Sequence, residues 1–220
     1  MKIALPQQSD PVHVGKLLCI GRNYADHAAE MSSDVPDEPM VFLKPASALV
    51  RTGGTVQLPP QSHEVHHEVE FVAVIGKQGK NIPEDEALDH VAAYAVGLDM
   101  TARDLQAKAK ERRHPWSVAK GFDTFAPLGP LTPASEIKNP QDLTLRLSVN
   151  GDVRQEASTE RLIFAVRNLV QYCSQIFTLT PGDLLYTGTP SGVGPVEDGD
   201  ELQATATGID PLRVSVRRSS

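Results

Sequence analysis

Cysteine is scarce in this sequence, and the scarcity limits where the protein can work. Only two of the 220 residues are cysteines, and Cys19 and Cys173 both lie among apolar neighbours. Two such residues do not make the disulfide framework typical of small secreted domains. We therefore expect buried free thiols in a reducing compartment, and we place the protein in the cytoplasm.

Basic charge and long apolar runs are also missing. The 21 lysines and arginines face 28 aspartates and glutamates, so the formal charge is −7. Without a basic tail or stripe, we expect no nucleic-acid or acidic-membrane partner. No apolar run approaches the roughly 20 residues that span a bilayer, and we expect no secretory leader. The expected partner is a small molecule.

The chain is long enough for a substantial core. With 220 residues and 40% apolar composition, we expect a single catalytic domain over 1–220, with an N-terminal extension over 1–15. No internal repeat or linker divides it. A polar loop containing prolines, 32–39, is a candidate lid.

Strand patterns outnumber helical ones. Apolar runs predict strands over 16–21, 40–44, 55–59, 66–76 and 94–100, and 181–216 shows strands separated by glycine turns. Asn150-Gly151 lies between two alternating runs in 143–157, which is typical of a hairpin. Helices are predicted over 23–31, capped by Asn23, over 83–94, and over 158–175 as the longest. This mixture favours a predominantly antiparallel α+β or sandwich-like body.

The segment HHEVEFVAVIG, residues 66–76, is predicted to be a buried strand containing two glutamates. Because strand side chains alternate, Glu68 and Glu70 share one face. The opposite face would carry Val69, Phe71, Ala73 and Ile75. The two glutamates stand about 6.6 Å apart at their roots, so both carboxylates can converge on one ion. Buried without a partner, they would repel each other at a large cost in free energy, so a cation is expected between them.

A third acid, Asp99, ends the strand predicted over 94–100. Three carboxylates without a cysteine suit Mg²⁺ or Mn²⁺, with open positions for water and substrate oxygens. A solvated strand face without metal is one alternative. A zinc site that uses neighbouring histidines is another, although strand parity places only His66 on the glutamate face. The histidines concerned are His63, His66 and His67.

His27 and Glu30 are three residues apart on the predicted helix and therefore share a face. They form either an exposed pair or a general base with the carboxylate that orients it. Lys120, on an irregular stretch, is either solvated or a contact for a substrate carboxylate or oxyanion. The segment TGTP, residues 187–190, offers backbone N–H groups to an anion at a glycine turn.

Six segments together resemble the fumarylacetoacetate hydrolase family: GRNYADHAAEM, FLKP, HHEVEFVAVIG, YAVGLDMTARDLQ, PWSVAKGFD and TGTPSGVGP. The resemblance runs in order from about residue 16 to the C-terminus, with spacing similar to that of the small acylpyruvase and oxaloacetate-acting branch. It implies an α+β, predominantly β fold, a mixed β-sandwich roll, and a homodimer. The separate N-terminal domain of fumarylacetoacetase has no counterpart here, so a small 2,4-dioxo acid is the expected substrate.

The resemblance also implies roles for individual residues. Mg²⁺ or Mn²⁺ would be held by Glu68, Glu70 and Asp99, beside a catalytic dyad of His27 and Glu30 under the lid. Contacts to the 2-oxo acid end of the substrate would come from Arg103, Gln106, Lys120 and Thr189. Lys44 matches a motif position to which we assign no role.

The reaction implied by the resemblance is metal-dependent hydrolysis of the carbon–carbon bond of acylpyruvates, such as acetylpyruvate or fumarylpyruvate. In this hypothesis His27, oriented by Glu30, activates water, and Lys120 helps to hold the developing negative charge. The same metal-enolate chemistry would serve an oxaloacetate decarboxylase, or a keto–enol tautomerase acting on oxaloacetate or a 2-hydroxy-dienoate. A metal-stabilised binding protein without turnover is the alternative from a different class.

Overall fold

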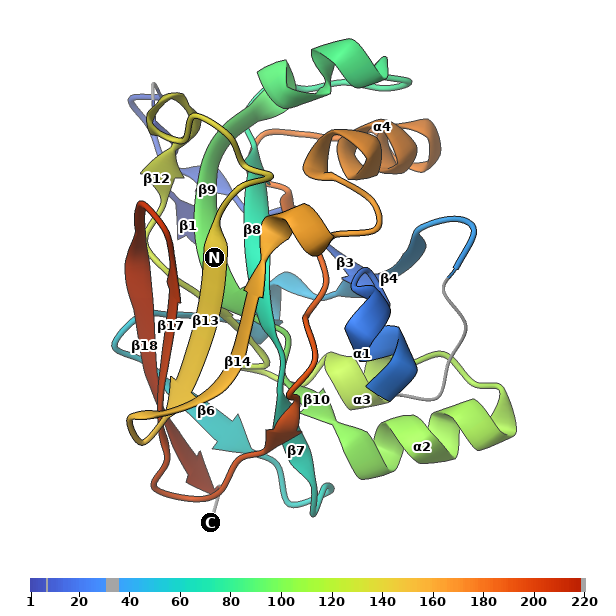
Figure 1. Cartoon of the computed structure of the whole chain (residues 1–220), viewed down its shortest axis with the longest axis vertical. Coiled ribbons are helices and arrows are strands. Elements are labelled where there is room, and N and C mark those ends of the chain that lie inside the picture. The colour runs from blue at the N-terminus through green and yellow to red at the C-terminus, as the bar shows by residue number, and fades with distance from the viewer. Residues whose placement is uncertain (7, 31–35, 219–220) are drawn as a thin grey trace.

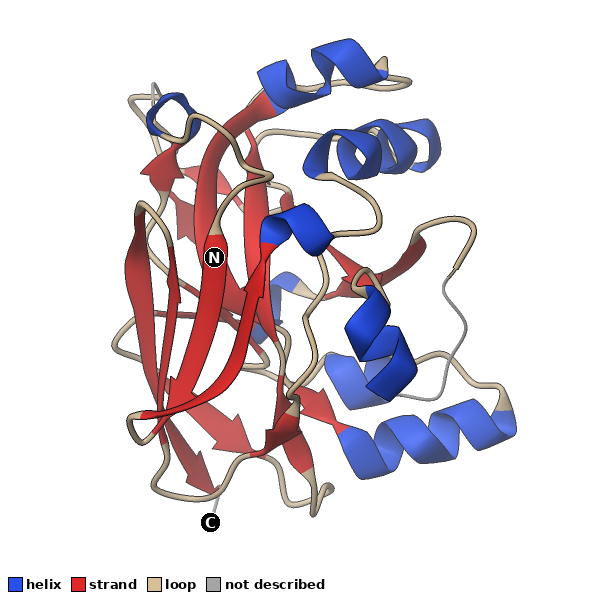
Figure 2. Ribbon diagram, in the orientation of Figure 1, coloured by secondary structure: helices blue, strands red, loops and turns tan. Residues whose placement is uncertain are grey.

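Strands predominate in the protein, and its α-helices lie together on one side of them (Figure 2). The computed structural model describes residues 1–6, 8–30 and 36–218. Within these ranges, none of the helices is long and apolar enough to cross a membrane. The predominance of strands, with the α-helices on one side of them, confirms the predicted α+β, predominantly β body.

The largest sheet is eight-stranded and mixed. Its order is β4 (Met40–Lys44), β3 (Leu17–Gly21), β15 (Leu184–Tyr186), β8 (Val69–Ile75), β9 (Val91–Leu98), β11 (Ala126–Leu128) and β5 (Leu49–Arg51), with β12 (Thr132–Pro133) also paired to β9. The central strands β8 and β9 are antiparallel, with Val69 opposite Leu98. The start of β8 therefore lies beside the end of β9, and the candidate acids lie at this position.

A five-stranded sheet packs against the eight-stranded one (Figure 1). Its order is β14 (Asp152–Ser158), β13 (Thr144–Val149), β17 (Glu201–Ala206), β18 (Ile209–Arg218) and β6 (Thr55–Leu58). A three-stranded sheet joins β10 (Thr101–Ala102), β7 (Val65–His67) and β16 (Gly194–Pro195). The N-terminal segment forms a two-stranded sheet from β1 (Lys2–Ile3) and β2 (Val12–His13).

The helices are short. The α-helices are α1 (Ala25–Glu30), α2 (Arg103–Arg112), α3 (Ser117–Lys120) and α4 (Val166–Ile176). The 3₁₀ helices are η1 (Ala46–Ala48), η2 (Glu84–His90), η3 (Ala134–Glu136) and η4 (Thr159–Arg161). The first three α-helices lie together on one side of the strands, with α2 and α3 in contact with β10, while α4 packs beside η2 (Figure 1).

The core confirms the predicted alternation along β8, whose seven residues are all buried. Phe71 and its neighbours on one face join the cluster between the two large sheets, which includes Leu145 and Leu147 of β13. Val72 and Val74 on the other face pack in a second cluster with residues of the N-terminal segment. Burial on both faces fixes the register of β8, because a shift by one residue would exchange the two sets of side chains.

Several predicted elements are confirmed with small shifts, and others are wrong. The strands over 16–21, 40–44, 55–59 and 94–100 correspond to β3, β4, β6 and β9. The Asn150-Gly151 turn joins β13 to β14, with both residues at positive φ. The single strand over 66–76 is wrong, because the chain breaks at Glu68 into β7 and β8. The helix over 83–94 is limited to η2, since Val91 already pairs with Ile75 in the sheet.

The helix predicted over 158–175 begins eight residues late, although α4 is still the longest α-helix in the described part of the chain. The backbone of Phe164 is held outside the helix by Asn23. Phe164 N–H donates to Asn23 Oδ1 at 2.7 Å, and Asn23 Nδ2 donates to the carbonyl of Phe164 at 3.0 Å. Asn23 therefore uses its side chain here and does not cap α1 as predicted.

Candidate active site

Three buried carboxylates meet where β8 begins and β9 ends. Glu68 precedes β8, Glu70 is its second residue, and Asp99 follows β9 directly. The backbone N–H of Asp99 donates to the carbonyl of Glu68 at 2.8 Å, which brings the two chain segments together. One oxygen from each carboxylate lies within 4.8 Å of the others. The structure therefore brings together the three acids expected to hold a cation.

Glu68 and Asp99 are paired with basic side chains. Lys120, at the end of α3, donates to Glu68 Oε2 at 2.8 Å and to Asp99 Oδ2 at 2.6 Å. Arg103, the first residue of α2, donates to Glu68 Oε1 at 2.5 Å and to Gln106 Oε1 at 2.7 Å. Lys120 is buried at the end of a short helix, so neither the irregular stretch nor the solvated lysine considered from the sequence describes it.

Lys44, the last residue of β4, contacts Asp99 from a buried position. Its ammonium pairs with Asp99 Oδ1 and donates to the carbonyls of Met100 at 3.0 Å and Phe125 at 2.5 Å. All three N–H groups of this fully buried lysine are therefore used. The effect is to fix one oxygen of Asp99 and leave the other facing Lys120.

The environment of Glu70 differs from that of its two neighbours. Its Oε2 accepts the backbone N–H of Gly188 at 2.7 Å, and no basic side chain of the described residues pairs with it. Burial and the negative charge of Asp99 raise the pKa of Glu70 well above its usual range. Burial also acts on Glu68, but Lys120 and Arg103 outweigh it and hold the pKa of Glu68 below its usual range. Glu70 is thus the carboxylate that lacks a counter-charge.

The donor set fits a hard divalent cation. Carboxylate oxygens are the ligands that Mg²⁺ and Mn²⁺ prefer, and a cation beside Glu70 would supply its missing charge. The cluster of potential ligands contains no histidine within the described residues. His66 bonds to Glu64 at 2.9 Å, and His67 bonds to Gln155 at 3.0 Å. The zinc alternative is therefore unsupported.

The predicted dyad is formed within α1. Nδ1 of the buried His27 lies 3.2 Å from Oε2 of Glu30, and Gly192 N–H donates to both Glu30 oxygens at 3.1 and 3.3 Å. Because an ionised carboxylate only accepts, Nδ1 carries the proton and Nε2 is free to accept one. His27 lines the pocket that contains the acids. Of the candidate lid over 32–39, residues 32–35 lie outside the described residues.

The TGTP segment acts on the protein's own groups. Gly188, at φ 99°, directs its N–H to Glu70, so the anion that this turn contacts is a carboxylate of the site. Thr189 lines the pocket, and its hydroxyl accepts from Nε2 of the buried Gln155 at 2.9 Å. The Oε1 atom of Gln155 accepts the backbone N–H of Val69 at 3.0 Å. Gln155, which sequence reasoning missed, therefore ties Thr189 to the start of β8.

One pocket contains most of the predicted site residues: His27, Glu68, Glu70, Asp99, Arg103, Gln106, Lys120 and Thr189. Glu30 contacts the pocket residue His27, and Lys44 contacts the pocket residue Asp99. Sequence reasoning missed further lining residues: Arg22, Met40, Phe42, Lys110 and Trp116. Lys110 could have been found, because it lies on the same face of α2 as Arg103 and Gln106.

Residues 16–217 match the family model described as fumarylacetoacetate (FAA) hydrolase C-terminal. The chain belongs to the fumarylacetoacetate hydrolase family. It is 47% identical over 203 residues to the mitochondrial oxaloacetate tautomerase of Arabidopsis thaliana, covering 92% of this chain and 91% of that protein. It is 46% identical over 196 residues to the mitochondrial oxaloacetate decarboxylase of Dictyostelium discoideum, covering 89% and 90%.

The structure is similar to that of fumarylpyruvate hydrolase from Pseudomonas aeruginosa in complex with Mn²⁺ and pyruvate. The TM-score is 0.92 at 43% identity, and the match covers 100% of this chain and 96% of that one. The fold is therefore the mixed β-sandwich roll of the fumarylacetoacetate hydrolase family, as the resemblance implied.

Proposed function

We propose that this member of the family is a divalent-cation-dependent hydrolase that cleaves acylpyruvates to pyruvate and a carboxylic acid. The observation that carries the proposal is the position of His27, which shares a pocket with Glu68, Glu70 and Asp99 and has Glu30 to orient it. The Mn²⁺ and pyruvate bound to the similar hydrolase of Pseudomonas aeruginosa support the same assignment.

The cation would be held by Glu68, Glu70 and Asp99. When bound, Mg²⁺ or Mn²⁺ would supply a Lewis acid that stabilises negative charge on the oxygens of a 2-oxo acid. Lys44 pairs with Asp99 and holds its carboxylate in place. Arg103 and Lys120 pair with Glu68 and hold its carboxylate in place. Arg103, Gln106 and Thr189 would contact the carboxylate end of the substrate, because all three line the pocket beside the acids.

His27 would act as the general base. Its Nε2 takes a proton from a water molecule, and the hydroxide equivalent adds to the distal carbonyl carbon of the acylpyruvate. The bond between that carbon and the adjacent methylene then breaks, and its electron pair remains with pyruvate as the enolate. The proton held by His27 returns to the methylene carbon, while the acid product carries the oxygen from water. Lys120 would stabilise the negative charge that develops.

A second candidate function is suggested by the identity to oxaloacetate-acting proteins. The relatives at 47% and 46% identity are named as an oxaloacetate tautomerase and an oxaloacetate decarboxylase. Both reactions pass through an enol or enolate of a 2-oxo acid, which the same pocket would stabilise. They differ from hydrolysis in requiring no water positioned for attack.

A proton NMR time course separates these functions. Mg²⁺-loaded protein would be incubated with acetylpyruvate in one tube and with oxaloacetate in another, each with a chelator control. Acetate plus pyruvate in the first tube, abolished by chelator, is the expected result. If acetylpyruvate persists while oxaloacetate yields pyruvate, the protein is a decarboxylase. If only the keto–enol ratio of oxaloacetate relaxes faster, it is a tautomerase.

A further inference from the structure

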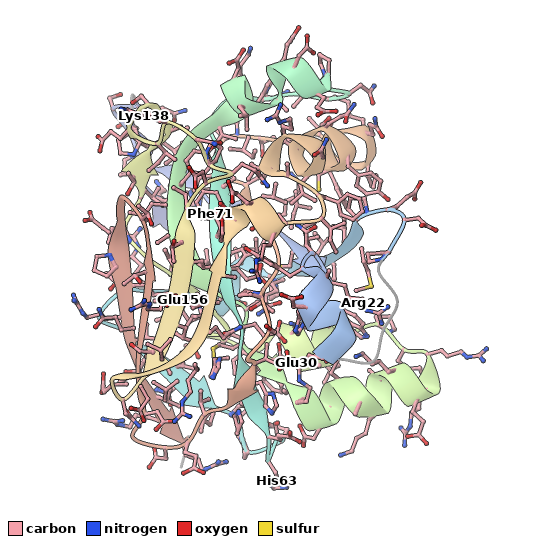
Figure 3. All side chains as sticks on the ribbon, in the orientation of Figure 1. Arg22, Glu30, His63, Phe71, Lys138 and Glu156 are labelled. Atoms are coloured by element: carbon pink, nitrogen blue, oxygen red, sulfur yellow. The ribbon has the colours of Figure 1, made fainter. Side chains whose placement is uncertain are left out.

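Gln155 is a buried polar residue at a position of β14 that faces the core. In the register with β13 it lies opposite Leu147, whose side chain belongs to the cluster between the two large sheets. Glu156, the next residue on β14, is exposed, as strand alternation requires (Figure 3). A buried amide costs free energy unless its hydrogen bonds are made. The partners of Gln155 therefore indicate what the residue does.

The orientation of the Gln155 amide is fixed by two backbone groups. Its Oε1 accepts the N–H of Val69 at 3.0 Å, and its Nε2 donates to the carbonyl of Pro190 at 2.9 Å. Because a backbone N–H only donates and a carbonyl only accepts, the reversed amide would lose both bonds. The amide's remaining lone pair and N–H are used by Nδ1 of His67 at 3.0 Å and by Oγ1 of Thr189 at 2.9 Å. The Thr189 hydroxyl must therefore accept from Gln155.

The hydroxyl of Thr189 keeps its own proton for another partner. A hydroxyl has one O–H to donate, and among the described residues this one makes no hydrogen bond besides the one that it accepts from Gln155. Thr189 lines the pocket together with Lys120 and the three acids, whereas Gln155 does not line it. The O–H of Thr189 is therefore free to donate to an oxygen that enters the pocket.

We propose that Gln155 is a positioning residue that makes Thr189 a hydrogen-bond donor to the 2-oxo acid. By occupying a lone pair of the hydroxyl, the amide directs the proton of Thr189 toward a carboxylate or 2-oxo oxygen of the substrate, both of which only accept. The inference rests on the proposed function, because it assumes that the 2-oxo acid lies beside Thr189. A residue of the five-stranded sheet thereby contributes to substrate recognition without touching the substrate.

Gln155 also has a structural effect, which differs from its effect on Thr189. Through the N–H of Val69 it holds the chain between Glu68 and Glu70. An effect of Gln155 through this backbone would reach the pocket whether or not residue 189 carries a hydroxyl. An effect through the hydroxyl would disappear once the hydroxyl is removed.

A double-mutant cycle separates the two effects. Thr189→Val removes the hydroxyl at nearly constant shape, Gln155→Met removes the amide at similar length, and a third variant carries both changes. Calorimetric titration of the Mn²⁺-loaded proteins with pyruvate gives the affinity, while thermal unfolding and a Mn²⁺ titration confirm that each variant is folded and loaded. Gln141→Met is the matched control, because Nε2 of Gln141 donates to the carbonyl of Thr159 at 2.9 Å, outside the pocket.

We expect Thr189→Val to weaken pyruvate binding about tenfold, the effect of one hydrogen bond to a charged group. Gln155→Met should weaken it about fivefold when Thr189 is present, and less than about twofold in the Thr189→Val background, because groups that act through one another are not additive. Gln141→Met should change it less than about twofold. An equal loss from Gln155→Met in both backgrounds, or no loss in either, would overturn the inference, as would a wild type that does not bind pyruvate.

A second measurement needs no substitution of Gln155. The side-chain amide signals of Gln155 are followed by NMR in Mg²⁺-loaded protein labelled with ¹⁵N-glutamine. Saturating pyruvate should shift these signals in the wild type and leave them in place in Thr189→Val. No shift in the wild type, or the same shift in both proteins, would overturn the inference. Failure of the proposed function looks different: the cycle would still be non-additive, but the wild type would not hydrolyse acetylpyruvate.

Discussion

The Nδ1 atom of His27 lies 3.2 Å from Oε2 of Glu30, one turn further along α1. The same carboxylate accepts the N–H of Gly192, from the segment that follows β15. Glu30 is thus held from a second part of the chain, and the imidazole is held in the tautomer whose Nε2 can accept a proton. This contact separates the dyad from an ordinary exposed pair on a short helix.

His27→Ala should abolish hydrolysis without affecting metal binding. Removing a general base typically lowers kcat by about 10²–10⁴-fold, and no atom of His27 belongs to the carboxylate cluster. Turnover of acetylpyruvate and the Mn²⁺ dissociation constant should both be measured. Asp26→Ala is the control, because Asp26 is exposed on the same helix and pairs with Arg161. Unchanged turnover in His27→Ala would contradict the role of the dyad.

Glu70→Gln should stabilise the metal-free protein. The pKa of Glu70 is raised on folding, so above its ordinary value the folded chain must either take up a proton or bury an unbalanced charge. The amide removes this penalty and can still accept the N–H of Gly188. Thermal unfolding at pH 8 with chelator should show Tm rising by about 2–4 °C for each kcal/mol recovered.

Glu68→Gln should have the opposite effect in the same assay. Lys120 and Arg103 hold the pKa of Glu68 low, so its ionised form stabilises the fold at pH values above its ordinary pKa. Loss of one partner of a buried ion pair costs about 3–5 kcal/mol. If the two variants shift Tm in the same direction, the assignment of opposite environments to these glutamates is wrong.

Cation binding should release protons and should tighten as pH rises. A carboxylate must be ionised to bind a metal, and burial with the charge of Asp99 raises the pKa of Glu70 above its ordinary 4.5. Between that value and the raised one, each ion should displace up to one proton. Calorimetry with Mn²⁺ in buffers of different ionisation enthalpy measures this number. Affinity that is constant with pH above 5, with no proton release, would argue against it.

Lys44→Met should destabilise the protein strongly. The substitution leaves Asp99 Oδ1 and the carbonyls of Met100 and Phe125 without their buried donor. The cost should be about 3–5 kcal/mol, measured by urea unfolding. Lys108→Met, on the exposed face of α2, should cost less than about 0.5 kcal/mol. A small effect at Lys44 would show that its network contributes little.

The sequence alone was sufficient to predict the features that depend on a single segment of the chain. The alternation of an extended chain was enough to predict that Glu68 and Glu70 point to the same side, although Glu68 lies just before β8 and only Glu70 within it. Asp99 was found because an apolar strand ends just before it. The Asn150-Gly151 turn followed from the two left-handed residues that a tight hairpin needs.

Contacts between distant segments could not be predicted in the same way. Asn23 bonds to Phe164, 141 residues away, and this contact both removes a helix cap and delays α4. Lys44 and Lys120 come from segments distant in the chain, and both are buried with their ammonium groups bonded to Asp99, which no single segment encodes.

The most direct test of the central claim is a Mn²⁺ titration followed by the electron paramagnetic resonance signal of the free ion. Wild-type protein, Glu70→Gln and the control Glu64→Gln would be compared, since Glu64 is exposed and bonds to His66. We expect one site per chain in the wild type and in Glu64→Gln, and no binding in Glu70→Gln despite its intact fold. Binding of Mn²⁺ to Glu70→Gln with wild-type affinity would contradict a cation held by Glu68, Glu70 and Asp99.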